Sequence, residues 1–199
     1  MIKIINIQIV LFVLLLNVSI PILGQEQIKH FNQGEPVLVR KKEFKDYSIK
    51  VPEYVEVSVK NEQLILKFVS TTDFAAILVV KYYDKKAETD LKELFRKTID
   101  LNWKHLILDF KQIYAFKPEE LRKGNAAEGY QINGHSMDKM PMKIYNMLGT
   151  VESKDKKKML LYSGSISVNP AHKNYKDFDE IKRYMNDFKM VMISAEFKE

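Results

Sequence analysis

The sequence predicts an α+β domain in which an antiparallel β-sheet is flanked by helices, an α/β/α sandwich. Apolar and polar residues alternate from Tyr47 to Phe68, which is typical of half-buried strands. The apolar period changes to that of an amphipathic helix after Asp84 and again after Pro170. The resulting order of strands, helix, strands and helix favours an antiparallel sheet with helices packed on its faces.

Four runs of residues make up the first group of predicted strands: Tyr47 to Val51, Val55 to Val59, Leu64 to Phe68 and Phe74 to Tyr83. Asn61 and Glu62 separate the second run from the third and predict a hairpin turn. The fourth run is apolar at nearly every position, which predicts a central strand that is covered on both faces.

The predicted first helix follows Asp84. Its apolar face carries Ala87, Leu91, Leu94, Phe95, Thr98 and Ile99. Its other face pairs Glu88 with Lys92 and Glu93 with Lys97, at a spacing that stabilises exposed helix surfaces. Residues 103–118 fit either a strand or a second short helix.

The second half predicts a three-stranded meander over residues 127–133, 142–152 and 159–168, with a charged hairpin turn from Ser153 to Lys158. A second amphipathic helix is expected to begin near Asn174 or Asp177. One stripe of that helix carries Phe178, Ile181, Met185 and Phe188.

These elements resemble the PsbP-like family over residues 46–192. The resemblance is carried by Asp46 to Pro52 with Tyr54 and Val55, the first helix, the strand pair Tyr145 to Val151 and Met159 to Ser165, and the final helix ending in Asn186, Asp187, Phe188 and Lys189. It implies an α/β/α sandwich that acts as a non-catalytic assembly or binding module. No metal-binding residue of the photosynthetic members has a counterpart here, so the resemblance implies no metal ligand.

The N-terminus has the order of a secretory signal: Lys3, an apolar run from Ile9 to Leu16, Pro21 and Gly24. We expect residues 1–24 to be a signal peptide that is cleaved after Gly24, residues 25–45 to be a mobile leader, and residues 46–199 to be a single domain. The apolar run is short for a membrane span, and the chain has no Cys to carry a lipid. We therefore expect a secreted or periplasmic protein without stable membrane insertion.

Composition argues against several classes of function. The formal charge is +6 and falls to +5 once Lys3 is removed with the signal. The lysine clusters of the chain lie between acidic stretches and do not alternate with aromatic residues, so we expect no nucleic-acid partner.

Thiol chemistry is excluded because the chain contains no Cys, and its 7 Gly residues are too scattered to form a phosphate-binding loop. Ser163, Gly164 and Ser165 do not form a nucleophile elbow, and we expect no enzyme.

One segment has the residue types of a copper site. His135, Met137, Met140 and Met142 lie close together in the sequence, and thioether and imidazole ligands suit Cu(I). The alternative is ordinary packing, since all eight methionines after Met1 lie between Met137 and Met192 and Met is a common core filler. Apart from copper at this segment, we expect no cofactor.

Aromatic residues gather in the segment whose structure is ambiguous: Trp103, Phe110, Tyr114 and Phe116. On the surface they would form a docking patch for a protein partner or an apolar ligand; against the sheet they would be core. The leading hypothesis is therefore an exported, non-enzymatic binding or assembly module that holds a protein partner. A periplasmic copper-binding protein is the alternative, and an enzyme whose site is assembled from distant residues is the third.

Overall fold

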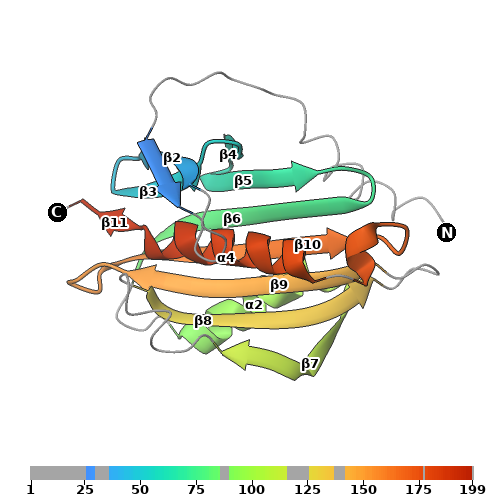
Figure 1. The fold of residues 1–199 in the computed structure, drawn as a ribbon. Coiled ribbons are helices and arrows are strands. Elements are labelled where there is room, and N and C mark those ends of the chain that lie inside the picture. Colours follow the sequence, from blue (N-terminus) through green and yellow to red (C-terminus); the bar gives the residue numbers. More distant parts are fainter. Residues whose placement is uncertain are drawn as a thin grey trace.

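The computed structural model describes residues 26–29, 36–85, 90–115, 126–136, 142–176 and 178–198 (Figure 1). The predicted signal peptide, residues 1–24, lies outside the described residues.

A seven-stranded sheet forms the centre of the fold, in the order β4, β5, β6, β10, β9, β8, β7. Its strands are β4 (Glu56–Lys60), β5 (Gln63–Ser70), β6 (Phe74–Asp84), β7 (Leu106–Ala115), β8 (Ala126–Ser136), β9 (Lys143–Glu152) and β10 (Lys158–Val168). Every neighbouring pair is antiparallel, as predicted. Most of the ambiguous segment 103–118 is therefore a strand, β7.

A smaller sheet has the order β1, β2, β3, β11. These strands are β1 (Glu26–Lys29), β2 (Pro36–Glu43), β3 (Tyr47–Pro52) and β11 (Glu196–Phe197). Antiparallel pairing holds residues 36–39 of β2 against β1 and residues 39–43 against β3. Val39 is buried, and Arg40 Nη2 donates a hydrogen bond of 2.5 Å to the Val55 carbonyl. This part of the predicted mobile leader is thus a strand, because its backbone groups pair with those of β1 and β3.

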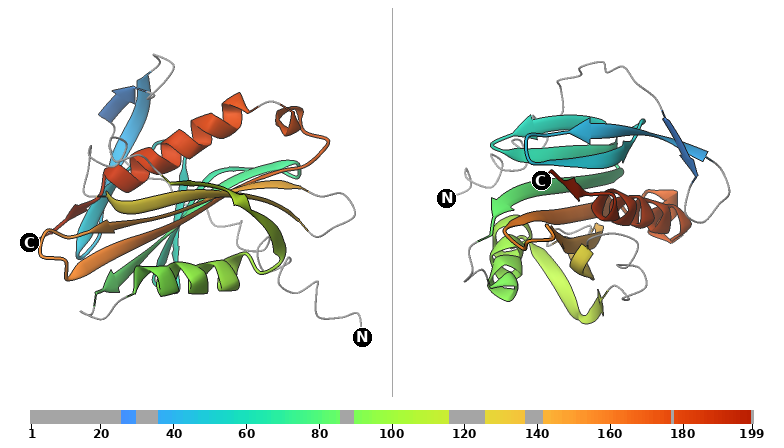
Figure 2. Two further views of the ribbon diagram at one scale, coloured as in Figure 1. Left: turned by 90° about the horizontal axis from the view of Figure 1, so that it is seen from below. Right: turned by 90° about the vertical axis from the view of Figure 1, so that its left-hand side faces the viewer.

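The helices lie on opposite faces of the large sheet (Figure 2), which confirms the predicted fold class. Helix α2 (Leu91–Asn102) begins where the Asp90 carboxylate accepts hydrogen bonds from the backbone N–H groups of Lys92 and Glu93. Helix α4 (Asp179–Ile193) follows a short 3₁₀ helix, η1 (Lys173–Tyr175). The acidic side chains of Asp179 and Glu180 suit the positive end of the α4 dipole.

Helix α4 packs closely on its face of the sheet because of one glycine. A Cβ atom at Gly164 would lie 2.6 Å from Cδ2 of Phe188, so only glycine leaves room for this ring. Phe188 is fully buried and packs edge-on against Phe68, with ring centroids 4.9 Å apart. The larger hydrophobic core of the protein lies here, between the sheet, α4 and β3.

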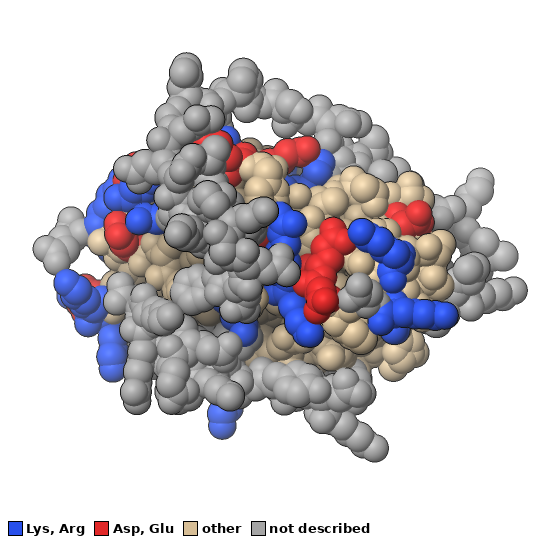
Figure 3. All heavy atoms as spheres, in the orientation of Figure 1, with Lys and Arg blue, Asp and Glu red and all other residues tan. Residues whose placement is uncertain are grey.

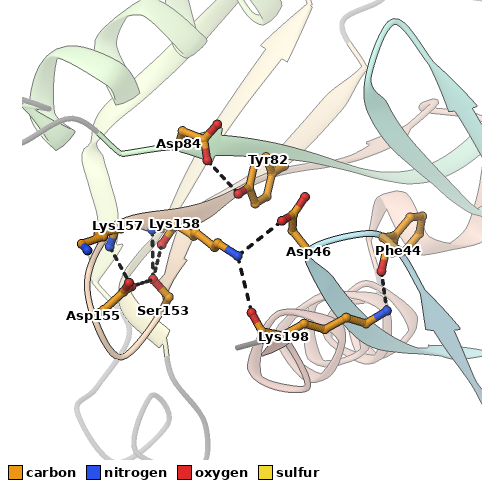
Figure 4. A network of polar contacts seen from close by, with 9 residues as sticks. All are labelled: Phe44, Asp46, Tyr82, Asp84, Ser153, Asp155, Lys157, Lys158 and Lys198. Atoms are coloured by element: carbon orange, nitrogen blue, oxygen red, sulfur yellow. Dashed lines mark hydrogen bonds and ion pairs between the residues drawn. The ribbon is translucent and has the colours of Figure 1, made fainter.

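Polar contacts join the C-terminal segment to two turns (Figure 4). Lys158 Nζ lies 3.3 Å from Asp46 Oδ1 and 3.4 Å from the Lys198 carbonyl oxygen. Lys198 Nζ donates to the Phe44 carbonyl at 2.5 Å. In the predicted β9–β10 turn, Ser153 Oγ accepts a hydrogen bond of 2.9 Å from the backbone N–H of Lys158. Because Lys158 also contacts Lys198, the C-terminal segment lies beside this turn.

Candidate binding face

Burial along the strands separates the covered part of the large sheet from a half-open part. In β9 the side chains from Ile144 to Val151 are buried on both faces. In β6 the burial alternates: Leu78 and Val80 are buried, whereas Ile77 and Val79 are half-buried. The prediction that this strand is covered on both faces is therefore wrong. Strand β10, and not β6, occupies the middle of the sheet.

The half-buried side chains lie on the α2 side. Leu161, Leu148 and Ile132 pack in one cluster with Phe95 of α2. Directly opposed residues of antiparallel strands point to the same face, and the register places Ser163 beside both Leu148 and Val79. Helix α2 therefore covers β8, β9 and the start of β10. The remainder of this side, which neither described helix covers and whose side chains are half-buried, is called the open face below and consists of Ile65, Lys67, Ala75, Ile77, Val79, Lys81, Ser165 and Ser167.

A buried amide borders the open face. The register aligns Lys67, Ile77, Ser165 and Asn146 in one row across β5, β6, β10 and β9. Ser165 Oγ donates a hydrogen bond of 3.0 Å to Asn146 Oδ1. Asn146 is fully buried, yet its Nδ2 has no hydrogen-bond partner within the described part of the chain. Unsatisfied buried donors are rare in folded proteins and require an explanation.

Lysines lie at the margins of the open face. Lys67 Nζ is 2.6 Å from a carboxylate oxygen of Glu56. Lys81 Nζ lies 5.0 Å from the centroid of the Tyr83 ring, and no carboxylate of the described ranges forms an ion pair with it. On the face seen in Figure 3, acidic and basic side chains lie next to one another. The open face therefore combines apolar side chains, serine hydroxyls and a positive margin.

Of the aromatic residues predicted to bind a partner, Trp103 has a described side chain. Trp103 follows the last residue of α2, is only 4% exposed and packs in one cluster with Phe95 and Leu106, so it belongs to the core. Phe110 and Tyr114 lie on the edge strand β7. Phe116 lies outside the described residues, and the docking role of these three residues stays a prediction.

Half of the predicted copper set can be placed. His135 is exposed at the end of β8, and Met142 is half-buried just before β9. The backbone N–H of Met142 donates to Ser136 Oγ, and that of Ser136 donates to the Met142 carbonyl, both at 3.0 Å. Met137 and Met140 lie outside the described residues. The described ranges hold no group of three or more His, Cys, Asp or Glu side chains arranged to bind a metal, and copper binding stays a prediction.

His172 has a structural role. Its Nδ1 accepts a hydrogen bond of 3.1 Å from the backbone N–H of Asn174 at the start of η1. Its ring stacks on Phe74, with centroids 4.9 Å apart.

Among the residues that the structure describes, no helix is long and apolar enough to cross a membrane.

No protein-family model and no curated protein matches the sequence. Among solved structures, the chain is similar to the Ran-binding protein Mog1p of Saccharomyces cerevisiae, with a TM-score of 0.48, 10% identity, and coverage of 80% of this chain and 95% of that one. A point mutant of Mog1 gives a TM-score of 0.47 and 11% identity over 79% of this chain and 95% of that chain. LpqN of Mycobacterium tuberculosis, which is involved in cell envelope biogenesis, gives a TM-score of 0.40 and 11% identity over 88% of this chain and 91% of that chain. At these scores and identities, the likenesses assign no function to the chain.

Proposed function

We propose that this protein is an exported, non-enzymatic binding module that holds a protein partner on the open face. The observation that carries the proposal is the set of apolar side chains, Ile65, Ile77 and Val79, that lie half-buried on the α2 side of β5 and β6. The register places Ile65 beside Val79, so part of this half-buried apolar surface is contiguous, and contiguous apolar surface that stays accessible to solvent usually marks a recognition site. An apolar centre with a polar margin is also the arrangement of protein interfaces.

The same substitution at two valines tests the proposal. Val79 lies on the open face, whereas Val59 is 66% exposed on β4 and is paired with Leu64 of the α4-side core. We expect tagged mature protein, recovered gently from the cell envelope, to bring down a stoichiometric partner in the wild type and in Val59→Lys, and to lose it in Val79→Lys. Circular dichroism establishes that both variants are folded. Equal recovery in all three proteins, or no partner at any salt concentration, would overturn the proposal.

Export is tested separately, by the mass and location of the mature chain. Cleavage after Gly24 gives a protein that begins at Gln25 and is released with the periplasmic or secreted fraction. An intact N-terminus on protein retained in the cytoplasm would contradict export.

Copper binding is the second candidate function. It is favoured by the two hydrogen bonds between Ser136 and Met142, which bring the ends of the 136–142 segment together beside His135. The proposal is that Met137 and Met140 complete a Cu(I) site there. An unchanged Cu(I) affinity after replacing both methionines by Leu would end it.

A further inference from the structure

We propose that the open face recognises an extended peptide segment that is both acidic and apolar, and that the main chain of one residue of this segment bonds to the pair formed by Ser165 and Asn146. The inference rests on the proposed function, since it specifies which part of a protein partner is held. Three observations support it: the hydrogen-bonding capacity of this pair, the spacing of the side chains on the face, and the charge at its margin.

The Ser165–Asn146 pair leaves one donor and one acceptor unused. Because Ser165 Oγ donates to Asn146 Oδ1, the Asn146 Nδ2 group remains as a donor and the lone pairs of Ser165 Oγ remain as acceptors. The reversed orientation of the Asn146 amide also leaves one donor and one acceptor. In an extended strand the N–H and the C=O of one residue point to the same side, so one residue of the segment satisfies both. Ser165 is half-buried on the open face, where such a residue can reach its Oγ. Asn146 is fully buried, so its amide must turn toward the segment when the segment binds.

The apolar part of the face has the periodicity of a strand. Ile77 and Val79 are successive same-face residues of β6, and Ser165 and Ser163 lie opposite them on β10. Successive side chains on one face of a strand are about 6.6 Å apart. An extended peptide has the same repeat, so its alternate apolar side chains match Ile77 and Val79 while its backbone lies over the serines.

The margin of the face favours negative charge in the segment. Lys81 is aligned with Gln63 and Lys60 across β6, β5 and β4. Lys60 is exposed, and neither lysine has an ion-pair partner among the described side chains. Glu56 is already paired with Lys67. A carboxylate beside Lys81 and Lys60 would therefore meet uncompensated positive charge, which is the complementarity that steers protein recognition.

Three labelled octapeptides with blocked ends test this chemistry by fluorescence anisotropy against the mature protein: alternating Asp-Leu, alternating Lys-Leu and alternating Asp-Ser. We expect the Asp-Leu peptide to bind at least about tenfold more tightly than either of the others. Its affinity should fall as salt is raised from about 50 to 500 mM, because exposed charges are screened. Equal affinity for the Asp-Leu and Lys-Leu peptides, or no effect of salt, would overturn the proposal.

Two buried polar groups provide a matched pair of variants. Asn146 and Tyr162 are both fully buried, and each has a polar atom without a partner in the described structure; Tyr162 points to the α4 side. We expect Asn146→Leu to weaken the Asp-Leu peptide about three- to tenfold, the worth of one hydrogen bond, and Tyr162→Phe to leave its affinity unchanged. An unchanged affinity in Asn146→Leu would overturn the role of the amide pair.

Failure of this inference is distinguishable from failure of the proposed function. If the Asp-Leu peptide does not bind but partner recovery still requires Val79, the peptide chemistry is wrong and the binding module stands. If recovery is also indifferent to Val79→Lys, both are wrong. Binding of palmitate in place of the peptide, lost in Asn146→Leu, would overturn the peptide and identify an amphiphile as the ligand.

Discussion

Replacing Gly164 by Ala tests the reasoning about how α4 reaches the sheet. The added Cβ would lie 2.6 Å and 2.8 Å from two carbons of the Phe188 ring and 3.3 Å from Cδ1 of Leu78. The Phe188 ring has little freedom to move, because it is fully buried and packs against Phe68 at a centroid distance of 4.9 Å. The helix or the ring must therefore shift.

Forcing an extra methyl group into a packed core typically costs about 1–3 kcal/mol, and contacts below 3.0 Å place Gly164→Ala at the upper part of that range. Urea denaturation followed by circular dichroism measures the loss. In a Phe188→Leu background the clash is relieved, so the same change should cost less there, giving a favourable coupling energy between the two sites. A Gly164→Ala protein as stable as the wild type, or the same loss in both backgrounds, would refute the account of this contact.

Three further predictions concern stability. Tyr54→Phe removes a 2.5 Å hydrogen bond to the buried carboxylate of Asp187 and should lower the unfolding free energy by about 1.5–3 kcal/mol; no change in urea unfolding would contradict this. Glu62 has a φ angle of 62°, so Glu62→Gly should raise stability by up to about 1 kcal/mol, and a lower melting temperature would argue against strain in this turn. Burial raises the pKa of Tyr47 and of Tyr145 from 10 to about 12, so the folded state keeps protons that the unfolded state releases. Stability should therefore hold below pH 10 and fall between pH 10 and pH 12, and equal denaturation midpoints at pH 9 and 11.5 would contradict it.

Elements with strong local signals were predicted well. The turn at Asn61 and Glu62 was predicted from polar residues between alternating runs, and both residues adopt the positive φ angles of a tight hairpin, 49° and 62°. Most of the α4 stripe was predicted from its spacing: Ile181, Met185 and Phe188 are buried, whereas Phe178 precedes the helix and is 44% exposed. Such signals depend only on neighbouring residues, which is why the sequence was sufficient.

Features that depend on tertiary partners were missed. Strand β2 has one short apolar run, residues 36–39, and its place in the fold comes from pairing with β1 and β3, which no local pattern specifies. The apolar run of β6 predicted cover on both faces, but α2 crosses to the other half of the sheet and leaves Ile77 and Val79 half-buried. The mismatch between a strand that is apolar at nearly every position and a face that is only half-buried is the signal of the candidate site, and it becomes visible only when the position of α2 is known. Likewise, the sequence could not decide that Trp103 belongs to the core.

Site-specific photocrosslinking in cells that express the protein tests the binding role of the open face most directly. A benzophenone side chain is introduced in place of Val79, on the open face, or in place of Val59, which is exposed on β4. We predict a discrete crosslinked adduct with one protein from position 79 and none from position 59. Adducts from neither position, or the same adducts from both, would contradict a binding site on the open face.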